Sequence, residues 1–184
     1  MHMKSLTASA ALAIVGLLAS AATWAHTKAE IDQSADRALK HFYMLNPSHR
    51  DLVGKAAGVL IFGHVTKAGA GVAGEFGEGV LRVHGQTVDY YSVGSASVGL
   101  TLGVARHREI ILFMTQDALD HFTNSKGWSA GGDSAIAVVS RGAGGQYDST
   151  IMGKPILGFV FGEKGLIGDL SLEGTKVTRI KTDD

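Results

Sequence analysis

The sequence predicts an α+β domain, with N-terminal helices packed on a curved, mainly antiparallel, glycine-rich sheet that approaches a barrel. Helical periodicity is confined to the segment before residue 58 and to residues 116–125, and strand patterns occupy much of the rest. Because strands mostly follow strands, the crossover helices of a parallel sheet are scarce. Glycine appears 25 times in 184 residues, about twice its usual frequency. Many of these glycines lie within or beside strand patterns, where glycine marks bulges, bends and close backbone approach.

The first 25 residues have the features of a secretory signal peptide. A positive start at Lys4 precedes an apolar run over residues 6–19 and a small-residue stretch that ends at Ala25. The apolar run is shorter than the roughly 20 residues that a membrane-spanning helix needs. We therefore expect cleavage after Ala25, with Ala21 and Ala22 as alternative sites and an uncleaved membrane anchor as the competing interpretation.

The chain contains no cysteine, which excludes disulfides, thiolate metal sites, cysteine nucleophiles and lipidation at a cleavage-site cysteine. Residues 26–184 are therefore expected to form a single periplasmic or secreted domain, with helices over residues 26–57 and a strand-rich core over residues 58–184. The formal net charge is zero. This balance argues against a nucleic-acid-binding protein, since such proteins carry a basic surplus.

Residues 26–45 are predicted to form an amphipathic helix. One face carries apolar residues at spacings of three and four: Ile31, Ala35, Ala38, Phe42 and Leu45. Asn46-Pro47 ends the helix, because the residue before a proline disfavours helical backbone. Ser48–Asp51 resembles a capping box for a second helix that runs to Ala57. The apolar face of the first helix has two alternative roles: it covers one face of the sheet, or it inserts shallowly into a membrane.

From residue 58 onward the dominant pattern is that of strands. Residues 95–104 alternate small or polar with apolar side chains, which is the clearest strand signal in the chain. Turns are predicted at His84–Gln86 and at Glu173-Gly174, the second of them joining the last two strands as a hairpin. The predicted strands cover residues 59–62, 72–76, 79–83, 88–91, 95–104, 109–114, 135–140, 155–161, 165–172 and 175–180.

Two glycine-containing motifs match functional patterns but lack the surroundings that those functions require. Gly69–Gly74 fits the dinucleotide pattern G-x-G-x-x-G, and Asp89 follows where a ribose-binding acid is wanted. The glycines that follow prevent the helix on which a pyrophosphate would rest. Gly127–Gly131 fits the nucleophile-elbow pattern around Ser129, but no histidine follows it. We predict no enzyme activity and no cofactor, with a serine hydrolase in another triad order as an alternative.

The histidines and carboxylates give no metal-binding pattern. No two histidines have the i, i+4 spacing of a helical metal site, so no metal site is predicted. Glu75 and Glu78 are three residues apart on an expected strand, so they are predicted to face opposite sides of the sheet. They therefore make a poor paired-carboxylate site.

A lipid-binding surface is predicted from basic residues at strand ends and turns. Gathered into one patch, such residues attract an anionic membrane by about 1 kcal/mol per cation. The alternative is that they are ordinary solvated charges. The predicted lipid-binding residues are Lys67, Lys154, Lys164, Lys176 and Arg179, with Lys181 beside them.

Four ordered blocks of the sequence resemble the SYLF domain family. They are the glycine-rich block Lys67–Leu81, Tyr90-Tyr91 with Ser95–Ser97, Phe113–Trp128, and Lys154–Ile180. The resemblance covers roughly residues 45–180. It implies a non-enzymatic lipid-binding module whose eukaryotic members bind phosphoinositides and other anionic lipids, and some of which bind or bundle actin.

The resemblance and the basic residues together predict peripheral contact with anionic phospholipid or phosphoinositide-type head groups, without a transmembrane helix in the mature chain. An exported chain meets actin only if it reaches a host, so actin is not an expected partner. The alternative function is that of an envelope structural or protein-interaction protein, which uses an exposed strand edge and has no lipid specificity.

Overall fold

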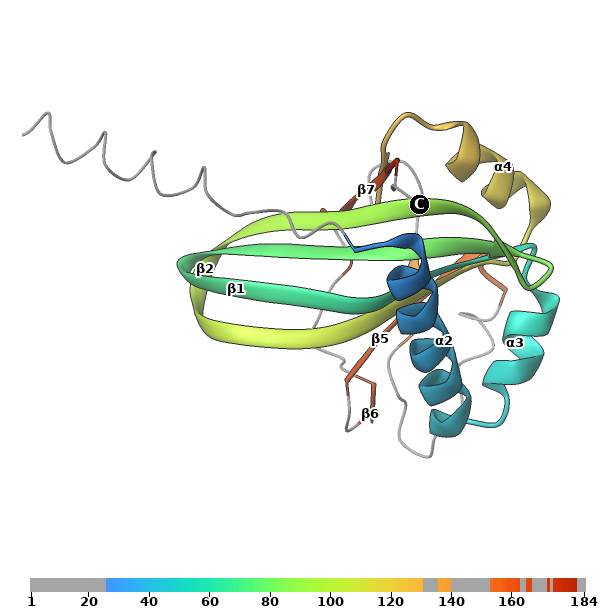
Figure 1. Ribbon diagram of the computed structural model, residues 1–184, viewed down its shortest axis with the longest axis horizontal. Helices are drawn as coiled ribbons and strands as arrows, with labels where there is room; N and C mark the ends of the chain where they lie inside the picture. Colours follow the sequence, from blue (N-terminus) through green and yellow to red (C-terminus); the bar gives the residue numbers. More distant parts are fainter. Residues whose placement is uncertain are drawn as a thin grey trace, which may run out of the picture.

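The structure, a computed structural model, describes residues 26–130, 136–139, 153–162, 165–166, 172 and 174–181. The predicted signal peptide and the predicted site residue Lys164 lie outside the described residues. The described residues form three helices and a curled, half-barrel sheet of seven strands that is mainly antiparallel (Figure 1). The predicted α+β class, with helices ahead of a curved sheet, is confirmed.

Two long strands, β1 (Gly58–Val83) and β2 (Gln86–Phe113), form an antiparallel hairpin. Its turn residues His84 and Gly85 have φ of 51° and 79°, as a two-residue type I′ turn requires. The first half of β2 pairs with β7 (Lys176–Arg179) and the second half with β5 (Ile156–Gly162). The sheet is extended by the short strands β3 (Trp128–Ser129), β4 (Ala137–Val138) and β6 (Gly165–Leu166). Among the described pairs only β4–β5 is parallel.

The hairpin is folded over on itself, so that both long strands turn back at one end of the molecule (Figure 1). The pairing register shifts between Ala70 and Val72, where Gly71 has φ 78°, and Gly103 on β2 has φ 119°. Glycine adopts this left-handed backbone readily because it has no Cβ. We call residues 68–76 and 98–104 the bent end.

The two halves of β1 lie against one another, and glycine makes this close approach possible. A Cβ atom at Gly79 would lie 2.3 Å from the carbonyl oxygen of Ile61. A Cβ atom at Gly63 would lie 2.4 Å from the backbone of Ser34 on α2 (Lys28–Leu45). The glycine excess therefore permits a sharply curved sheet with a helix seated on it, as the sequence predicted.

Helix α2 packs on one face of this sheet, which we call the α2 face (Figure 1). Its buried residues Ile31, Ala35, Ala38 and Phe42 are four of the five predicted for its apolar side. They pack against buried strand residues such as Ile61 and others of β1, β2 and β5. The sheet-covering role is confirmed, and the apolar side of α2 is not available for membrane insertion.

Helix α3 (His49–Lys55) packs beside α2 through a buried histidine. The His49 ring stacks on Phe42 with centroids 3.7 Å apart, and its Nδ1 lies 2.6 Å from the Phe42 carbonyl oxygen. Because a carbonyl only accepts, Nδ1 carries the proton. Burial lowers the pKa of His49, so the packed form is the neutral imidazole.

The opposite face of the sheet is concave, since side chains from non-adjacent strand halves meet on it. Its core contains Leu60, Phe62, Val93 and Ile111, among others. Helix α4 (Gln116–Asn124), which the sequence predicted over residues 116–125, adds Leu119 and Phe122 to this core. The rings of Phe113, Tyr91 and Trp128 surround Phe122 at centroid distances of 4.7, 4.9 and 5.6 Å.

Several predicted details are wrong. The separate strands predicted between residues 59 and 114 are two continuous strands, with register shifts after Phe62, Ala70 and Leu81. Ser48 makes no capping hydrogen bond, because its N–H and hydroxyl donate to Asn46 Oδ1. The last two strands are not a hairpin: β6 pairs with β5, whereas β7 pairs with β2 and β3.

Candidate functional site

The structure spreads the predicted basic residues over different parts of the sheet. Lys67 lies on the first half of β1, opposite Ala105 and beside the bent end. Lys154 precedes β5, whose first residue pairs with Phe113, so about 25 Å of strand separates it from Lys67. Lys176 and Arg179 both lie on β7. The four described residues therefore occupy at least two separate regions.

Arg179 holds parts of the fold together. Its Nε lies 2.7 Å from Asp89 Oδ2. Its Nη2 donates to the Tyr91 hydroxyl at 3.3 Å and to the Thr123 carbonyl at 3.2 Å. These contacts tie β7 to β2 and to the last turn of α4, and they balance the charge of the guanidinium. They favour a structural role for Arg179.

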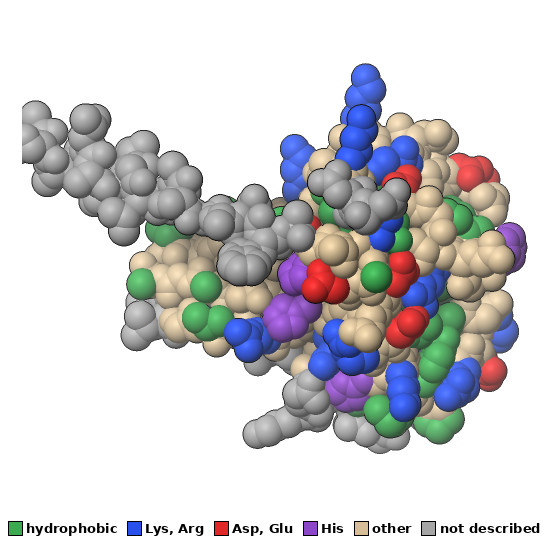
Figure 2. All heavy atoms as spheres, viewed as in Figure 1, with side chains coloured by type: hydrophobic (Ala, Val, Ile, Leu, Met, Phe, Trp, Pro, Cys, Tyr) green, Lys and Arg blue, Asp and Glu red, His purple; other side chains and the backbone are tan. Residues whose placement is uncertain are grey.

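The bent end instead exposes large apolar side chains. Val72, Phe76 and Val104 are 62%, 54% and 68% exposed, and Ala68 and Ala70 beside them are exposed as well. Figure 2 shows hydrophobic side chains on this end of the molecule. We call these five residues the apolar end. Several large apolar side chains exposed at one end of a protein indicate an interaction surface.

A group of basic side chains comes from α2 and from the parts of β1 and β2 beneath it, and we call it the cationic band. It consists of Arg37, His41, His64, Arg106 and Arg108. Arg106 is two residues from Val104 on β2, and the Nη1 atom of Arg108 lies 3.3 Å from Nδ1 of His41. Burial lowers the pKa of His64, and the charges of Arg106, Arg108, His26 and Arg37 lower it further. The groups therefore lie close enough to act on one another.

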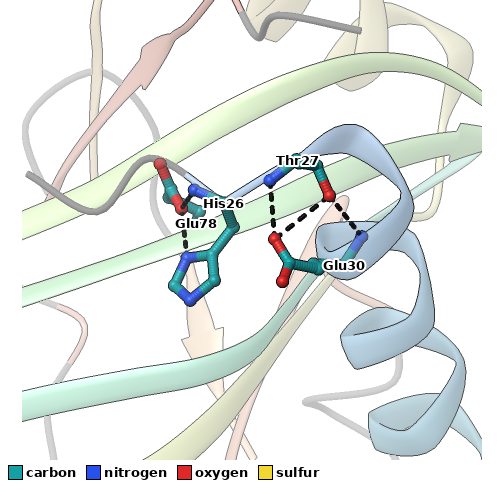
Figure 3. A network of polar contacts seen from close by, with 4 residues as sticks. All are labelled: His26, Thr27, Glu30 and Glu78. Atoms are coloured by element: carbon teal, nitrogen blue, oxygen red, sulfur yellow. Dashed lines mark hydrogen bonds and ion pairs between the residues drawn. The ribbon is translucent and has the colours of Figure 1, made fainter.

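A groove of about 720 Å³ connects these two features. Its lining includes Arg37 and His64 of the cationic band and Phe76 of the apolar end. The start of α2 forms one wall, and a polar network fixes it (Figure 3).

In that network Thr27 and Glu30 form a capping box. The Thr27 Oγ1 atom accepts from the Glu30 N–H at 3.3 Å, and Glu30 Oε2 accepts from the Thr27 N–H at 2.9 Å. The His26 ring places Nδ1 2.7 Å from Glu78 Oε2 (Figure 3). The first turn of α2 is thereby tied to β1.

The concave face carries a buried polar cluster among apolar neighbours. His107 Nε2 lies 3.0 Å from Glu109 Oε1 and 4.0 Å from Glu75 Oε1. Burial, and then the charge of Glu109, raises the pKa of Glu75. Within the described ranges, this is the group of side chains close enough to share a metal ion. Glu78 contacts His26 instead, so Glu75 and Glu78 face opposite sides as predicted.

Neither glycine-containing motif has the surroundings that its chemistry requires. Gly69–Gly74 lies inside β1 at the bend, so no helix begins there. Ser129 lies in β3, which follows α4 and pairs with β7, whereas a nucleophile elbow places its serine between a strand and a helix. In the part of the chain that is described, no helix combines the length and apolar character needed to cross a membrane.

Sequence reasoning did not find the cationic band or the buried cluster, because their members come from distant elements. Arg37 lies on α2, His64 on β1 and Arg106 on β2, and they meet only through the pairing of β1 with β2 and the packing of α2 on the sheet. One signal was available: His107 and Glu109 continue the every-second-residue line of Ile111 and Phe113, which places two polar residues on a core-facing side of a strand.

One family model matches the second half of the chain. Residues 94–183 match the family model Ysc84, described as Las17-binding protein actin regulator. The match includes Arg106, His107, Arg108 and Glu109, whereas the glycine-rich block Lys67–Leu81 lies outside it. No curated protein matches the chain.

Proposed function

Because the chain belongs through residues 94–183 to the Ysc84 (SYLF) family of binding modules, we propose that it is a non-enzymatic lipid-binding protein that docks on anionic membranes. The observation that carries this proposal is the position of the apolar end beside the cationic band on the α2 face. A surface with both properties fits a membrane interface, where apolar side chains meet the acyl boundary and cations meet phosphate groups.

The two parts of this surface contribute different forces. Burying a fully exposed valine or phenylalanine side chain stabilises an association by roughly 1.5–3 kcal/mol, and the apolar end offers Val72, Phe76 and Val104 in partly exposed form. Each arginine of the cationic band adds about 1 kcal/mol near an anionic surface. Since neither part alone gives stable anchoring, binding is expected to require both.

The anionic head groups are proposed to bind at the cationic band. Arg37, Arg106 and Arg108 are guanidinium groups, which pair with phosphate through two parallel hydrogen bonds. The groove beside Arg37 and His64 is large enough for a phosphorylated sugar head group. Of the residues predicted from the sequence, Lys67 lies nearest the bent end, but its charge acts on Glu75 of the concave face and it does not belong to the cationic band.

We also propose that the chain is exported to the periplasm or secreted, with residues 1–25 removed. Cleavage after Ala25 would convert the His26 backbone nitrogen, which lies 3.3 Å from Glu78 Oε2, into an α-ammonium group. That ammonium would then form an ion pair with Glu78 at the start of α2. N-terminal sequencing of the exported chain tests this, and a chain that still begins at Met1 contradicts it.

Co-sedimentation with lipid vesicles tests the proposed function. The protein is expected to pellet with vesicles of phosphatidylcholine and phosphatidylserine at low salt, and poorly with phosphatidylcholine alone. High salt is expected to release most of it, since the Debye length shrinks from about 10 Å at 0.1 M to about 3 Å at 1 M. Vesicles that contain a phosphoinositide distinguish a head-group preference from general anionic attraction.

A second candidate function is protein binding, which the family description as an actin regulator supports. It predicts no pelleting with any of these vesicles and co-sedimentation with actin filaments instead. Equal pelleting with anionic and zwitterionic vesicles at both salt concentrations would contradict the proposal that attraction to anionic head groups drives lipid binding.

A further inference from the structure

The buried cluster on the concave face is assembled by the folding-over of the hairpin. His107 and Glu109 are two residues apart on β2, so both side chains point to the same face. Glu75 comes from the second half of β1, which the bend brings across the first half toward β2. Three chemically active side chains therefore meet on the concave face.

This cluster is almost completely enclosed. The side chains of Glu75, His107 and Glu109 are 7%, 2% and 2% exposed. Glu109 uses Oε1 toward His107, whereas its Oε2 atom is buried without a hydrogen-bond partner in the structure. His107 Nδ1 is also buried and without a partner. A buried carboxylate oxygen without a donor is costly, so a bound cation would stabilise the cluster.

The charges of the neighbouring groups also favour a bound cation. Two carboxylates at one site repel one another, and their attraction to nearby charges must offset the loss of hydration. The charges of His107 and Lys67 act in the opposite direction on Glu75, but burial and the charge of Glu109 outweigh them, so the pKa of Glu75 is raised. Glu109 contacts the His107 imidazole and also lies within hydrogen-bonding reach of the Glu75 carboxyl group, so a cation between the two carboxyl groups would relieve their repulsion.

We propose that Glu75, His107 and Glu109 bind a divalent transition-metal ion such as Zn²⁺. The candidate ligand atoms all lie within 4.8 Å of one another. Ligands at about 2.0–2.2 Å from a tetrahedral ion lie roughly 3.4 Å apart. The 3.0 Å pair therefore fits nearly unchanged, and the 4.0 Å pair needs a small rotation of the Glu75 side chain.

The ligand set also indicates which ions fit. Imidazole nitrogen favours Zn²⁺ and other first-row transition metals, whereas Mg²⁺ and Ca²⁺ prefer oxygen ligands alone. With three protein ligands, the ion would keep one position for water. An ion held by these three residues would join the second half of β1 to β2 and so hold the bent end in place.

Calorimetric titration of Zn²⁺ into chelator-treated protein tests this site. The wild-type chain is expected to bind one equivalent with a rise in Tm. The Glu109→Gln variant keeps the shape of the side chain but loses its charge, and it is expected to bind at least tenfold more weakly. The chain has other histidines, so His121→Ala, on the exposed side of α4, is the matched control and is expected to bind like the wild type.

The Glu75→Gln variant distinguishes the loss of a metal ligand from misfolding. Glu75 is the least buried member of the cluster, so its replacement is expected to disturb the fold least. It is expected to weaken Zn²⁺ binding while the metal-free protein keeps the circular dichroism spectrum of the wild type. The proposal is overturned if the wild-type chain binds no stoichiometric Zn²⁺, or if both carboxamide variants bind as tightly as it does.

Discussion

The Gly79→Ala variant is expected to lose about 3 kcal/mol of unfolding free energy relative to the wild type. The added methyl group would lie 2.3 Å from the Ile61 carbonyl oxygen and 2.5 Å from Phe62 Cδ1. The backbone cannot retreat without separating the two halves of β1, and overpacking of this kind typically costs 1–3 kcal/mol or more. For a chain of this size we expect Tm to fall by roughly 6–12 °C.

Gly74→Ala is the matched control for this variant. A Cβ atom at Gly74 meets nothing within 4 Å, and its φ is not positive. Reduced flexibility of the unfolded chain is therefore expected to leave stability unchanged or raise it by up to about 1 kcal/mol. Thermal unfolding followed by circular dichroism measures both variants. Equal Tm values for the two would show that the halves of β1 do not pack as described.

The Val72→Asp variant is expected to bind anionic vesicles at least tenfold more weakly than the wild type. The substitution removes apolar area worth about 1.5 kcal/mol, which alone corresponds to roughly a tenfold change in affinity. The new carboxylate is also repelled by the anionic surface. Val72 is 62% exposed, so the fold and its Tm are expected to remain unchanged.

Val88→Asp provides the control for position. Val88 is similarly exposed, at 55%, but it lies near the His84-Gly85 turn, at the end of the hairpin opposite the bent end. Binding isotherms from co-sedimentation with phosphatidylserine-containing vesicles compare the two variants. If Val88→Asp weakens binding as much as Val72→Asp does, net charge rather than insertion of the apolar end explains the effect.

Local patterns predicted much of the fold. The buried side of α2 was readable because helical period alone places Ile31, Ala35, Ala38 and Phe42 on one line. The glycine excess correctly indicated a curved sheet. The positions of its irregularities were not predictable, because a bulge depends on which residues oppose each other across β1 and β2.

The candidate site was less accessible to sequence reasoning for the same physical reason. Lysines at strand ends are common on any solvated surface. Because the sequence did not show which strands pair, it could not show whether Lys154 and Lys176 share one surface. Val72, Phe76 and Val104 read as ordinary strand residues until the bend places them at the exposed end. Distances between strands arise from register and curvature, which are tertiary properties.

Fluorescence from one labelled position tests most directly the central claim that the bent end docks on the membrane. The chain has no cysteine, so Val104→Cys and Val88→Cys variants each carry an environment-sensitive fluorophore at a single site. With anionic vesicles, the Val104→Cys conjugate is expected to show a blue-shifted, stronger emission, and the Val88→Cys conjugate no change. Protein that pellets with these vesicles while the Val104→Cys conjugate shows no shift, or a shift equal to that of Val88→Cys, would contradict the account.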